Sequence, residues 1–353
     1  MRNLCIVALT LIFFSCNKHD VVNDSRSFRM GFQNSAPRFD DINLFVRSLN
    51  LWTTRADAAI ISTEVPWKEL LAGTNAAIYV NDHYKDLASF YRNRNLMLWV
   101  YIDPQNGLER SSDAQALVAA GKSIAQADVQ AKYRNFVIAM DSILKPEHLG
   151  LALETNLIRL ASSPSIYNGV KQAANDVAKE LKSRNIAARL SVSVQVETAW
   201  GKFGSSSFQG IAQDLQDFPF IEEIGFSSYP YLVFNTPGEI PADYYSRVMS
   251  ANKFPVFIAE GGWASKSITT PTISFISSNE TQKEYIERHH QLLQSVRATA
   301  LFQLAFTDID INIVPPPVPP NLGYFISLGL LDTNMQPKPA LSAWDEIFRK
   351  RLE

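Results

Sequence analysis

Residues 96–102 have the sequence LMLWVYI, an unbroken apolar run that decides which kind of fold the chain can adopt. Strands that are buried on both faces, as in a parallel sheet, are apolar throughout. A segment with the apolar spacing of a helix follows at 129–144. A buried strand followed by a helix is the repeating unit of parallel α/β folds, so this stretch predicts such a fold.

The same strand-then-helix unit recurs along the chain. Strands are predicted at 28–32, 58–62, 96–102, 149–153, 188–194, 223–227, 255–259 and 300–306. Helical segments are predicted at 40–51, between the second strand and about residue 94, and at 129–144, 166–183, 208–217, 242–251, 280–296 and 339–351. Eight units predict a single α/β domain, a (β/α)₈ TIM barrel, over residues 28–353. No G-x-G-x-x-G follows the first strand, which argues against a dinucleotide-binding sheet.

The N-terminal residues have the pattern of an export signal. A short basic start (Met1 to Asn3) precedes an apolar run at 4–14 that is too short to span a bilayer as a helix. The run ends at Ser15-Cys16, and the whole segment resembles a bacterial lipoprotein signal. The resemblance implies that residues 1–16 are a signal peptide, that Cys16 is lipidated, and that 17–27 form a tether. The alternatives are an ordinary cleaved signal and a buried N-terminal strand.

Composition limits the partners of the chain. The formal net charge is −2, so nothing favours binding to nucleic acid or to an acidic membrane surface. Both cysteines lie in the predicted signal, which excludes a disulfide or a thiolate metal site from the barrel. The histidines show no metal-binding spacing, and no G-x-S-x-G motif occurs. We therefore expect no metal or cofactor, membrane contact only through the lipid, a location at the cell envelope, and a monomer.

Acidic residues follow several of the predicted strands. In a parallel barrel these positions face the mouth where active sites lie, and burying a charge there needs a compensating reason. The candidates are Glu64, Asp103, Glu154, Glu197, Glu260 and Asp308. The loop at 308–337 is long and proline-rich, and is predicted to be either a surface excursion or one wall of the cleft.

Glu260 is the strongest catalytic candidate. It closes the apolar run in FPVFIAEGGW at 254–263. We expect Gly261 and Gly262 to leave space beside the carboxylate and Trp263 to stack on a sugar ring. The alternative is a buried glutamate that is paired for structural reasons.

The same stretch resembles the seventh-strand nucleophile motif of clan A glycoside hydrolases, especially the family 53 galactanases and family 17 glucanases. Residues 224–232, IGFSSYPYL, are similar to the end of their sixth strand, where a tyrosine hydrogen-bonds the nucleophile; Tyr229 is the matching position. Residues 328–344, LGLLDTNMQPKPALSAW, resemble the return to their last helix. The resemblance implies retaining glycoside hydrolysis by two glutamates, with Glu260 as the nucleophile.

In that clan the acid/base glutamate ends the fourth strand, a position that Glu154 occupies here. The residue before it is usually an asparagine that binds the sugar 2-hydroxyl, and here it is Leu153. Asn156 is the nearest side chain that could replace this contact. The alternative interpretation of Glu154 is a structural carboxylate at a strand end.

The other polar and aromatic candidates are expected to bind substrate. Glu197 is the main competitor for the acid role, but is more typical of a sugar-hydroxyl acceptor or a structural pair. Asp103, like Glu64, is expected to bind sugar or to pair with Arg38. Tyr231, Trp200 and Asp308 complete the predicted binding set.

These features predict a retaining glycoside hydrolase that acts on extracellular oligo- or polysaccharide. The alternative is a non-catalytic surface glycan-binding lipoprotein on a degenerate barrel. Leu153 favours this alternative, as do Phe302 and Phe306 on the eighth strand, where a tryptophan is common in the clan.

Overall fold

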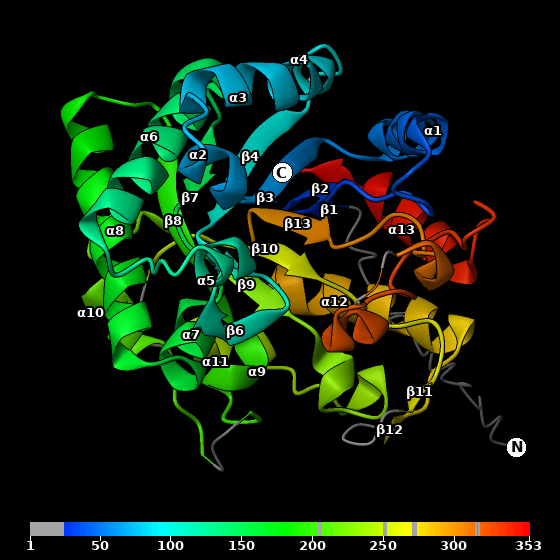
Figure 1. The fold of residues 1–353 in the computed structure, drawn as a ribbon. Helices are drawn as coiled ribbons and strands as arrows, with labels where there is room; N and C mark the ends of the chain where they lie inside the picture. The colour runs from blue at the N-terminus through cyan, green and yellow to red at the C-terminus, as the bar shows by residue number, and fades with distance from the viewer. Residues whose placement is uncertain (1–24, 204–206, 250–252, 270–273, 315, 317) are drawn as a thin grey trace, which may run out of the picture.

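The computed structural model describes residues 25–203, 207–249, 253–269, 274–314, 316 and 318–353, and it forms a parallel eight-stranded barrel (Figure 1). The strands are β2 (Arg29–Phe32), β3 (Ala58–Glu64), β4 (Met97–Asp103), β7 (His148–Gly150), β8 (Arg189–Gln195), β9 (Glu223–Ser228), β10 (Val256–Gly261) and β13 (Ala300–Gln303). Their order in the sheet is β2-β13-β10-β9-β8-β7-β4-β3. The predicted TIM barrel is therefore confirmed, with each strand within a few residues of its predicted position.

The barrel closes between β2 and β3 by close approach of the backbones. The amide of Asp57, just before β3, donates to the carbonyl oxygen of Met30 at 2.9 Å. A Cβ atom on Gly31 would lie 2.2 Å from the carbonyl oxygen of Ala58, so only glycine fits at this seam.

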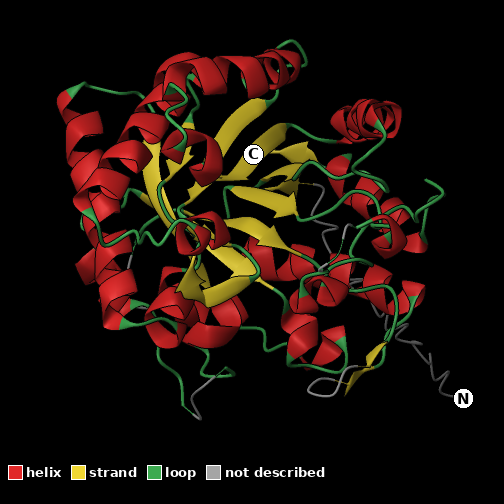
Figure 2. Ribbon diagram, in the orientation of Figure 1, coloured by secondary structure: helices red, strands yellow, loops and turns green. Residues whose placement is uncertain are grey.

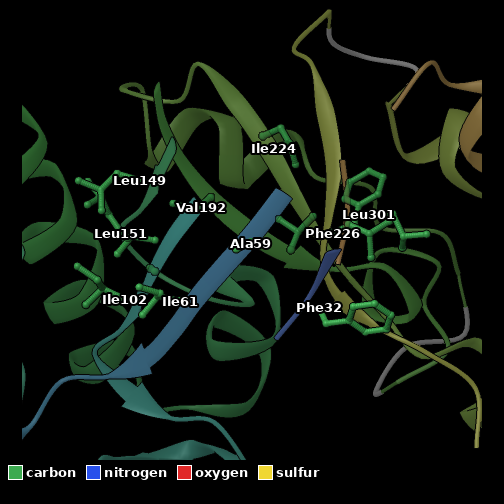
Figure 3. Packing of buried hydrophobic residues seen from close by; sticks show 14 of the residues in the cluster. Phe32, Ala59, Ile61, Ile102, Leu149, Leu151, Val192, Ile224, Phe226 and Leu301 are labelled. Atoms are coloured by element: carbon green, nitrogen blue, oxygen red, sulfur yellow. The ribbon is translucent and has the colours of Figure 1, made fainter. Parts of the chain in front are cut away.

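Side chains alternate between the inside and the outside of the barrel, as the two-residue period of strands requires. The interior holds Ala58, Ile60, Trp99, Tyr101, Leu153, Phe257, Ala259, Ala300 and Phe302. The residues between them pack outward against the helices, and Figure 3 shows part of this layer, including Ile61, Ile102 and Leu149.

Tyr101 occupies the middle of the interior, and two glycines make room for it. A Cβ atom at Gly150 would lie 2.3 Å from its ring, and one at Gly225 would lie 2.5 Å from its hydroxyl oxygen. The hydroxyl donates to Ser191 Oγ at 3.1 Å, so this buried polar group is satisfied.

Helices surround the strands on the outside, as Figure 2 shows with helices in red and strands in yellow. They are α1 (Ile42–Trp52), α2 (Trp67–Leu71), α3 (Ala76–His83), α4 (Lys85–Arg92), α5 (Gln115–Ala119), α6 (Ala127–Leu144), α7 (Thr155–Ala161), α8 (Pro164–Ser183), α9 (Val196–Ala199), α10 (Ala212–Asp217), α11 (Tyr244–Met249), α12 (Asn279–Ser295) and α13 (Pro339–Phe348). Within the described ranges no helix combines the length and apolar character that crossing a bilayer requires.

Several short elements in the loops were not predicted from the sequence. The hairpin of β5 (Gln105–Asn106) and β6 (Glu109–Asp113) follows β4. Helix α9 begins directly after the fifth barrel strand, α7 follows the fourth strand after a short turn, and the 3₁₀ helix η5 (Pro320–Tyr324) lies in the long proline-rich loop. These elements are too short for an apolar period to show.

The folded part of the chain begins earlier than predicted. Strand β1 (Ser25–Arg26) pairs in parallel with β14 (Arg351–Leu352), although 17–27 were predicted to be a tether. Arg26 is buried and its Nη2 lies 2.6 Å from Asp57 Oδ2, so the end of the predicted tether belongs to the barrel. The predicted signal and Cys16 lie outside the described residues.

Candidate active site

A cavity of about 470 Å³ lies at the C-terminal ends of the strands, and both predicted catalytic glutamates line it. Its other lining residues are Gly107, Leu108, Glu109, Arg110, Leu157, Ala161, Gln195, Phe203, Tyr229, Leu232, Leu304, Asn321, Tyr324 and Phe325. Three of them come from the 308–337 loop, which confirms that this loop forms one wall. A cavity of similar size outside the barrel, between α3, α6 and α8, has only Glu180 as an acidic residue among its described lining.

Glu154 sits in a backbone conformation that is rare for a residue with a side chain. Its φ is +50°, in the left-handed region, at the point where β7 turns into α7. The Ser193 Oγ accepts the Glu154 amide at 2.9 Å and holds this turn. The carboxylate accepts from Ser227 Oγ at 2.5 Å and from Arg110 Nε at 2.9 Å. Strain of this kind is typical of functional positions, because the surrounding structure must maintain it.

Arg110 is the buried cation of the site. It comes from β6, and its Nη1 donates to Asp103 Oδ2 at 2.6 Å while its Nε donates to Glu154. Burial raises the pKa of Asp103 to about 6, even though Arg110 opposes the shift. The three residues form a buried ion triad with one positive group between two acids.

Glu260 is half-buried at the cavity and follows a register irregularity in β10 between Ile258 and itself. Burial raises the pKa of Glu260 to about 7; repulsion from Glu154 adds to the shift, and Arg110 opposes it. With a pKa of about 7, Glu260 retains its proton up to about neutral pH. One proton shared by two carboxyls is the charge state that acid-assisted displacement at a glycosidic bond needs.

The glycines after Glu260 do not open space beside its carboxylate, contrary to the prediction. A Cβ atom on Gly261 would lie 2.5 Å from the carbonyl oxygen of Ser228, and one on Gly262 would lie 2.7 Å from Gln303 Nε2. These glycines instead let neighbouring segments pack closely. Trp263 is fully buried, and its Nε1 donates to Ser277 Oγ at 3.1 Å, so it is a core residue and not a sugar platform.

The two tyrosines after β9 take different positions. Tyr229 lines the cavity, and burial, with the nearby charges of Glu260 and Glu154, raises its pKa well above the ordinary value. Its predicted hydrogen bond to the nucleophile stays a prediction. Tyr231 is buried away from the cavity and donates to the carbonyl oxygen of Tyr324 at 2.8 Å, which corrects its placement among the substrate-binding residues.

Glu197 lies beneath the cavity and not in its wall. It is fully buried and accepts from the Tyr229 amide at 2.9 Å, from the Tyr244 hydroxyl at 2.5 Å, and from Gln195 Nε2. Burial raises the pKa of Glu197 to about 7. Its predicted contact with sugar is therefore wrong, because its oxygens are occupied by protein groups.

The side chains of Asn156 and Trp200 also form their contacts with other groups of the protein. Asn156 is buried and exchanges two hydrogen bonds with the backbone of Gln195, at 2.9 and 2.8 Å, so it cannot replace the missing sugar contact. Trp200 stacks on Tyr244 with a centroid distance of 5.5 Å and donates to its carbonyl oxygen at 2.9 Å, outside the cavity.

The remaining acidic candidates are structural or peripheral. Asp103 pairs with Arg110 and not with Arg38, which forms an exposed pair with Asp40 at 2.8 Å. Asp308 is buried against Lys338 at 2.5 Å and borders a separate cavity. Its predicted place in the sugar site is therefore wrong.

Sequence reasoning missed most of the cavity lining, including Arg110, Leu304 and Asn321, and also Ser227, which donates to Glu154. Ser227 was inside a quoted motif, where its position next to the end of a strand was a usable signal. Leu304 lies within the predicted eighth strand at 300–306, whereas Arg110 and Asn321 lie in a short hairpin and a loop whose path the sequence does not encode in a period. The two phenylalanines noted on the eighth strand do not face the cavity: Phe302 lies in the barrel interior and Phe306 in the outer core.

No cluster of three or more histidine, cysteine, aspartate or glutamate residues suited to a metal occurs within the described ranges. No protein-family model matches the chain, and no curated protein matches it.

Many solved structures share the fold. An exo-β-1,4-mannosidase from an Opitutaceae bacterium superposes with a TM-score of 0.63 at 12% identity, over 91% of this chain and 59% of that chain. A GH5_18 protein from Bifidobacterium longum in complex with Manβ1-4GlcNAc gives 0.62 at 16%, over 91% and 78%. A β-glucuronidase from Ruminococcus gnavus gives 0.57 at 14%, and the chain spans 49% of its length. These neighbours are glycoside hydrolases, and at such identity the likeness establishes the barrel.

Proposed function

We propose that the chain is a retaining glycoside hydrolase in which Glu260 is the nucleophile and Glu154 the acid/base. The observation that carries the proposal is the convergence of these two carboxyls, from β7 and β10, on one cavity at the mouth of the barrel. The raised pKa of Glu260 beside Glu154 and the fold of the similar structures support it.

The reaction has two displacements. Glu260 attacks the anomeric carbon while Glu154 protonates the leaving glycosidic oxygen, which breaks the bond and leaves a glycosyl-enzyme ester. Glu154, now ionised, takes a proton from water, and the water oxygen attacks the same carbon and frees Glu260. Each inversion reverses the other, so the anomeric configuration is retained.

The unliganded site favours the opposite proton distribution. Arg110 and Ser227 both donate to Glu154. Burial raises the pKa of Glu260 to about 7, so Glu260 is the group that holds a proton near neutral pH. The assigned roles require the proton on Glu154 when the glycosidic oxygen is in place. Substrate binding therefore has to release Arg110 from Glu154.

Azide rescue of two alanine variants tests the roles. Wild type is first screened on 4-nitrophenyl glycosides of several sugars. We expect Glu260→Ala to be inactive and, with azide, to form a glycosyl azide of inverted configuration, because azide enters the space of the nucleophile. Glu154→Ala with azide should give the retained azide, since azide then attacks the glycosyl-enzyme. Interchanged products would reverse the assignment, and full activity of Glu260→Ala would refute it.

One observation favours a second candidate, a glycan-binding protein without catalysis. Leu153 turns into the barrel interior and Asn156 is bonded to the backbone, so no amide from this segment is free for the sugar 2-hydroxyl. Binding of glycans without release of product by wild type would support this candidate.

We also propose that Cys16 carries a lipid that holds the protein at the bacterial cell envelope. The basic start, apolar run and small residue before Cys16 support it. Cys16→Ala should move the protein from the membrane fraction to the soluble fraction; persistence in the membrane would contradict the anchor.

A further inference from the structure

The rim of the cavity is joined across the barrel mouth by one contact between distant loops. Asn321 Nδ2, in the loop after the eighth barrel strand, donates to the carbonyl oxygen of Leu108 at 2.9 Å. Leu108 lies at the tip of the β5–β6 hairpin, after the third strand. The adjacent Gly107 amide donates to Glu64 Oε1 at 2.9 Å, which fixes the tip to the end of β3. We call the Asn321–Leu108 contact the clasp.

The clasp closes one of the two ends of the site. Glu154 and Glu260 end the fourth and seventh strands, and the scissile bond has to lie between them. Sugar and leaving group therefore extend to opposite sides of the line that joins these residues. The clasp spans the side of the first and second strands, where β2 and β3 lie. A glycan chain can extend from the cavity only on the other side.

The lining of the cavity indicates which part of the substrate lies under the clasp. The two loops of the clasp contribute the polar side chains Glu109, Arg110 and Asn321 to the lining, beside Leu108, Tyr324 and Phe325. The far side has one polar side chain, Gln195, among Leu157, Ala161 and Phe203. A sugar ring at the reaction centre needs hydrogen-bonding partners for its hydroxyls, whereas a leaving group can rest on an apolar surface. The glycone therefore belongs under the clasp.

Charge narrows the class of sugar. Arg110 is the one basic residue among the described lining residues, and its pair with Asp103 at 2.6 Å remains when substrate releases it from Glu154. Glu109 and one of the two proposed catalytic glutamates add negative charge to the wall. A carboxylate on the sugar would meet this negative field without a free cation to bind.

Resting on the proposed function, we infer that the enzyme is exo-acting and removes single uncharged sugar residues from non-reducing ends. In each cycle one terminal glycosidic C–O bond breaks, and water supplies the hydroxyl on the released sugar and the hydrogen on the shortened chain. The cavity of about 470 Å³ is in the usual size range for a small ligand.

Labelled tetrasaccharides test this inference. β-1,3- and β-1,4-glucan, β-1,4-galactan and β-1,4-mannan tetrasaccharides carry 2-aminobenzamide at the reducing end, and products are separated over time. We expect labelled trisaccharide as the first labelled product and monosaccharide as the unlabelled one. Labelled mono- or disaccharide as the first product would overturn exo action. Turnover of a 4-nitrophenyl glucuronide at the rate of the best uncharged glycoside would overturn the charge argument.

A clasp variant has a matched control in the same loop. Asn321→Ala removes the donor, and Asn312→Ala removes an exposed asparagine that bonds only locally, to Asp310 at 2.9 Å. Loss of one hydrogen bond should raise the share of internal cleavage about fivefold in Asn321→Ala. The control should match wild type. An unchanged product pattern in Asn321→Ala would overturn the role of the clasp.

Failure of the inference and failure of the proposed function give different results. Internal products would overturn exo action and leave glycoside hydrolysis intact. If no glycoside is cleaved, the proposed function fails. Calorimetry with the same oligosaccharides then tests whether the cavity binds the ends of glycan chains. Equal affinity for disaccharide and tetrasaccharide would support binding at chain ends. Affinity that rises with each added sugar, or no binding at all, would overturn it.

Discussion

Replacing Arg110 by methionine tests the ion triad that sets the charge of the site. The substitution keeps much of the side-chain volume and removes the only group that neutralises Asp103 and Glu154 among their described contacts. Removing one partner of a buried ion pair leaves an uncompensated charge and costs about 3–5 kcal/mol. We expect this loss in the free energy of unfolding at pH 8.

The cost should depend on pH, and the sign follows from Asp103. Its pKa in the folded protein is about 6, above the ordinary 3.8. The folded state thus binds this proton more tightly than the unfolded state does. The free energy of unfolding of wild type therefore falls by about 3 kcal/mol as pH rises from the lower to the higher of these two pKa values. Without Arg110 the pKa of Asp103 rises further. At pH 5 Asp103 is mostly protonated in both proteins, so the penalty of Arg110→Met should be roughly half of that at pH 8.

Urea unfolding at pH 5 and pH 8 measures both quantities. The control is Arg38→Met, whose partner Asp40 is exposed, so the free energy of unfolding should hardly change. Adding Asp103→Asn to Arg110→Met removes the stranded charge and keeps an acceptor for the Gln105 amide, so it should restore part of the stability. A penalty below about 1 kcal/mol at pH 8, or an equal penalty at both pH values, would refute the reasoning.

Further predictions concern the paired glutamates and the barrel interior. Activity (kcat/KM) should fall as pH rises above about 7, because the site then loses the proton that Glu260 holds and that the leaving oxygen has to receive; a rate that stays level to pH 9 would contradict this. Glu260→Ala should lower kcat on a 4-nitrophenyl glycoside by about 10⁴-fold or more, while calorimetry shows a folded protein. The raised pKa of the buried Glu197 makes the free energy of unfolding of wild type fall as pH rises through 7. Glu197→Gln should remove about 3 kcal/mol from the difference in this free energy between pH 5 and pH 8. Gly225→Ala should cost about 1–3 kcal/mol by crowding Tyr101, and less in a Tyr101→Phe background; equal costs in both would show that the crowding lies elsewhere.

The strands of the barrel were predictable because each is a buried apolar run with a helix after it. The LMLWVYI run became β4, with Trp99 and Tyr101 inside and the residues between them outside. The carboxylates at strand ends followed from the same logic, because the ends of parallel strands meet at one face of a barrel. Glu154 and Glu260 were found in this way.

The details of the site were not predictable because they depend on contacts between distant loops. Arg110 lies in a short hairpin with no periodic pattern, yet it contacts Glu154 across 44 positions of sequence. Trp263 follows the Glu260 motif as a sugar platform would, but the turn at Gly262 (φ +154°) places it in the core. Residue type marks a candidate, and the direction of the chain after the strand decides where its side chain lies.

The pairing of β1 with β14 places both ends of the folded domain on the same side of the barrel. β1 leads directly into the first barrel strand, so this side is the one where strands begin, and the cavity is on the side where they end. Any segment attached ahead of Ser25 or after Glu353 therefore leaves from the side where the strands begin, opposite the cavity. A protein held to a surface through either end would present its cavity outward, toward glycans that arrive from solution.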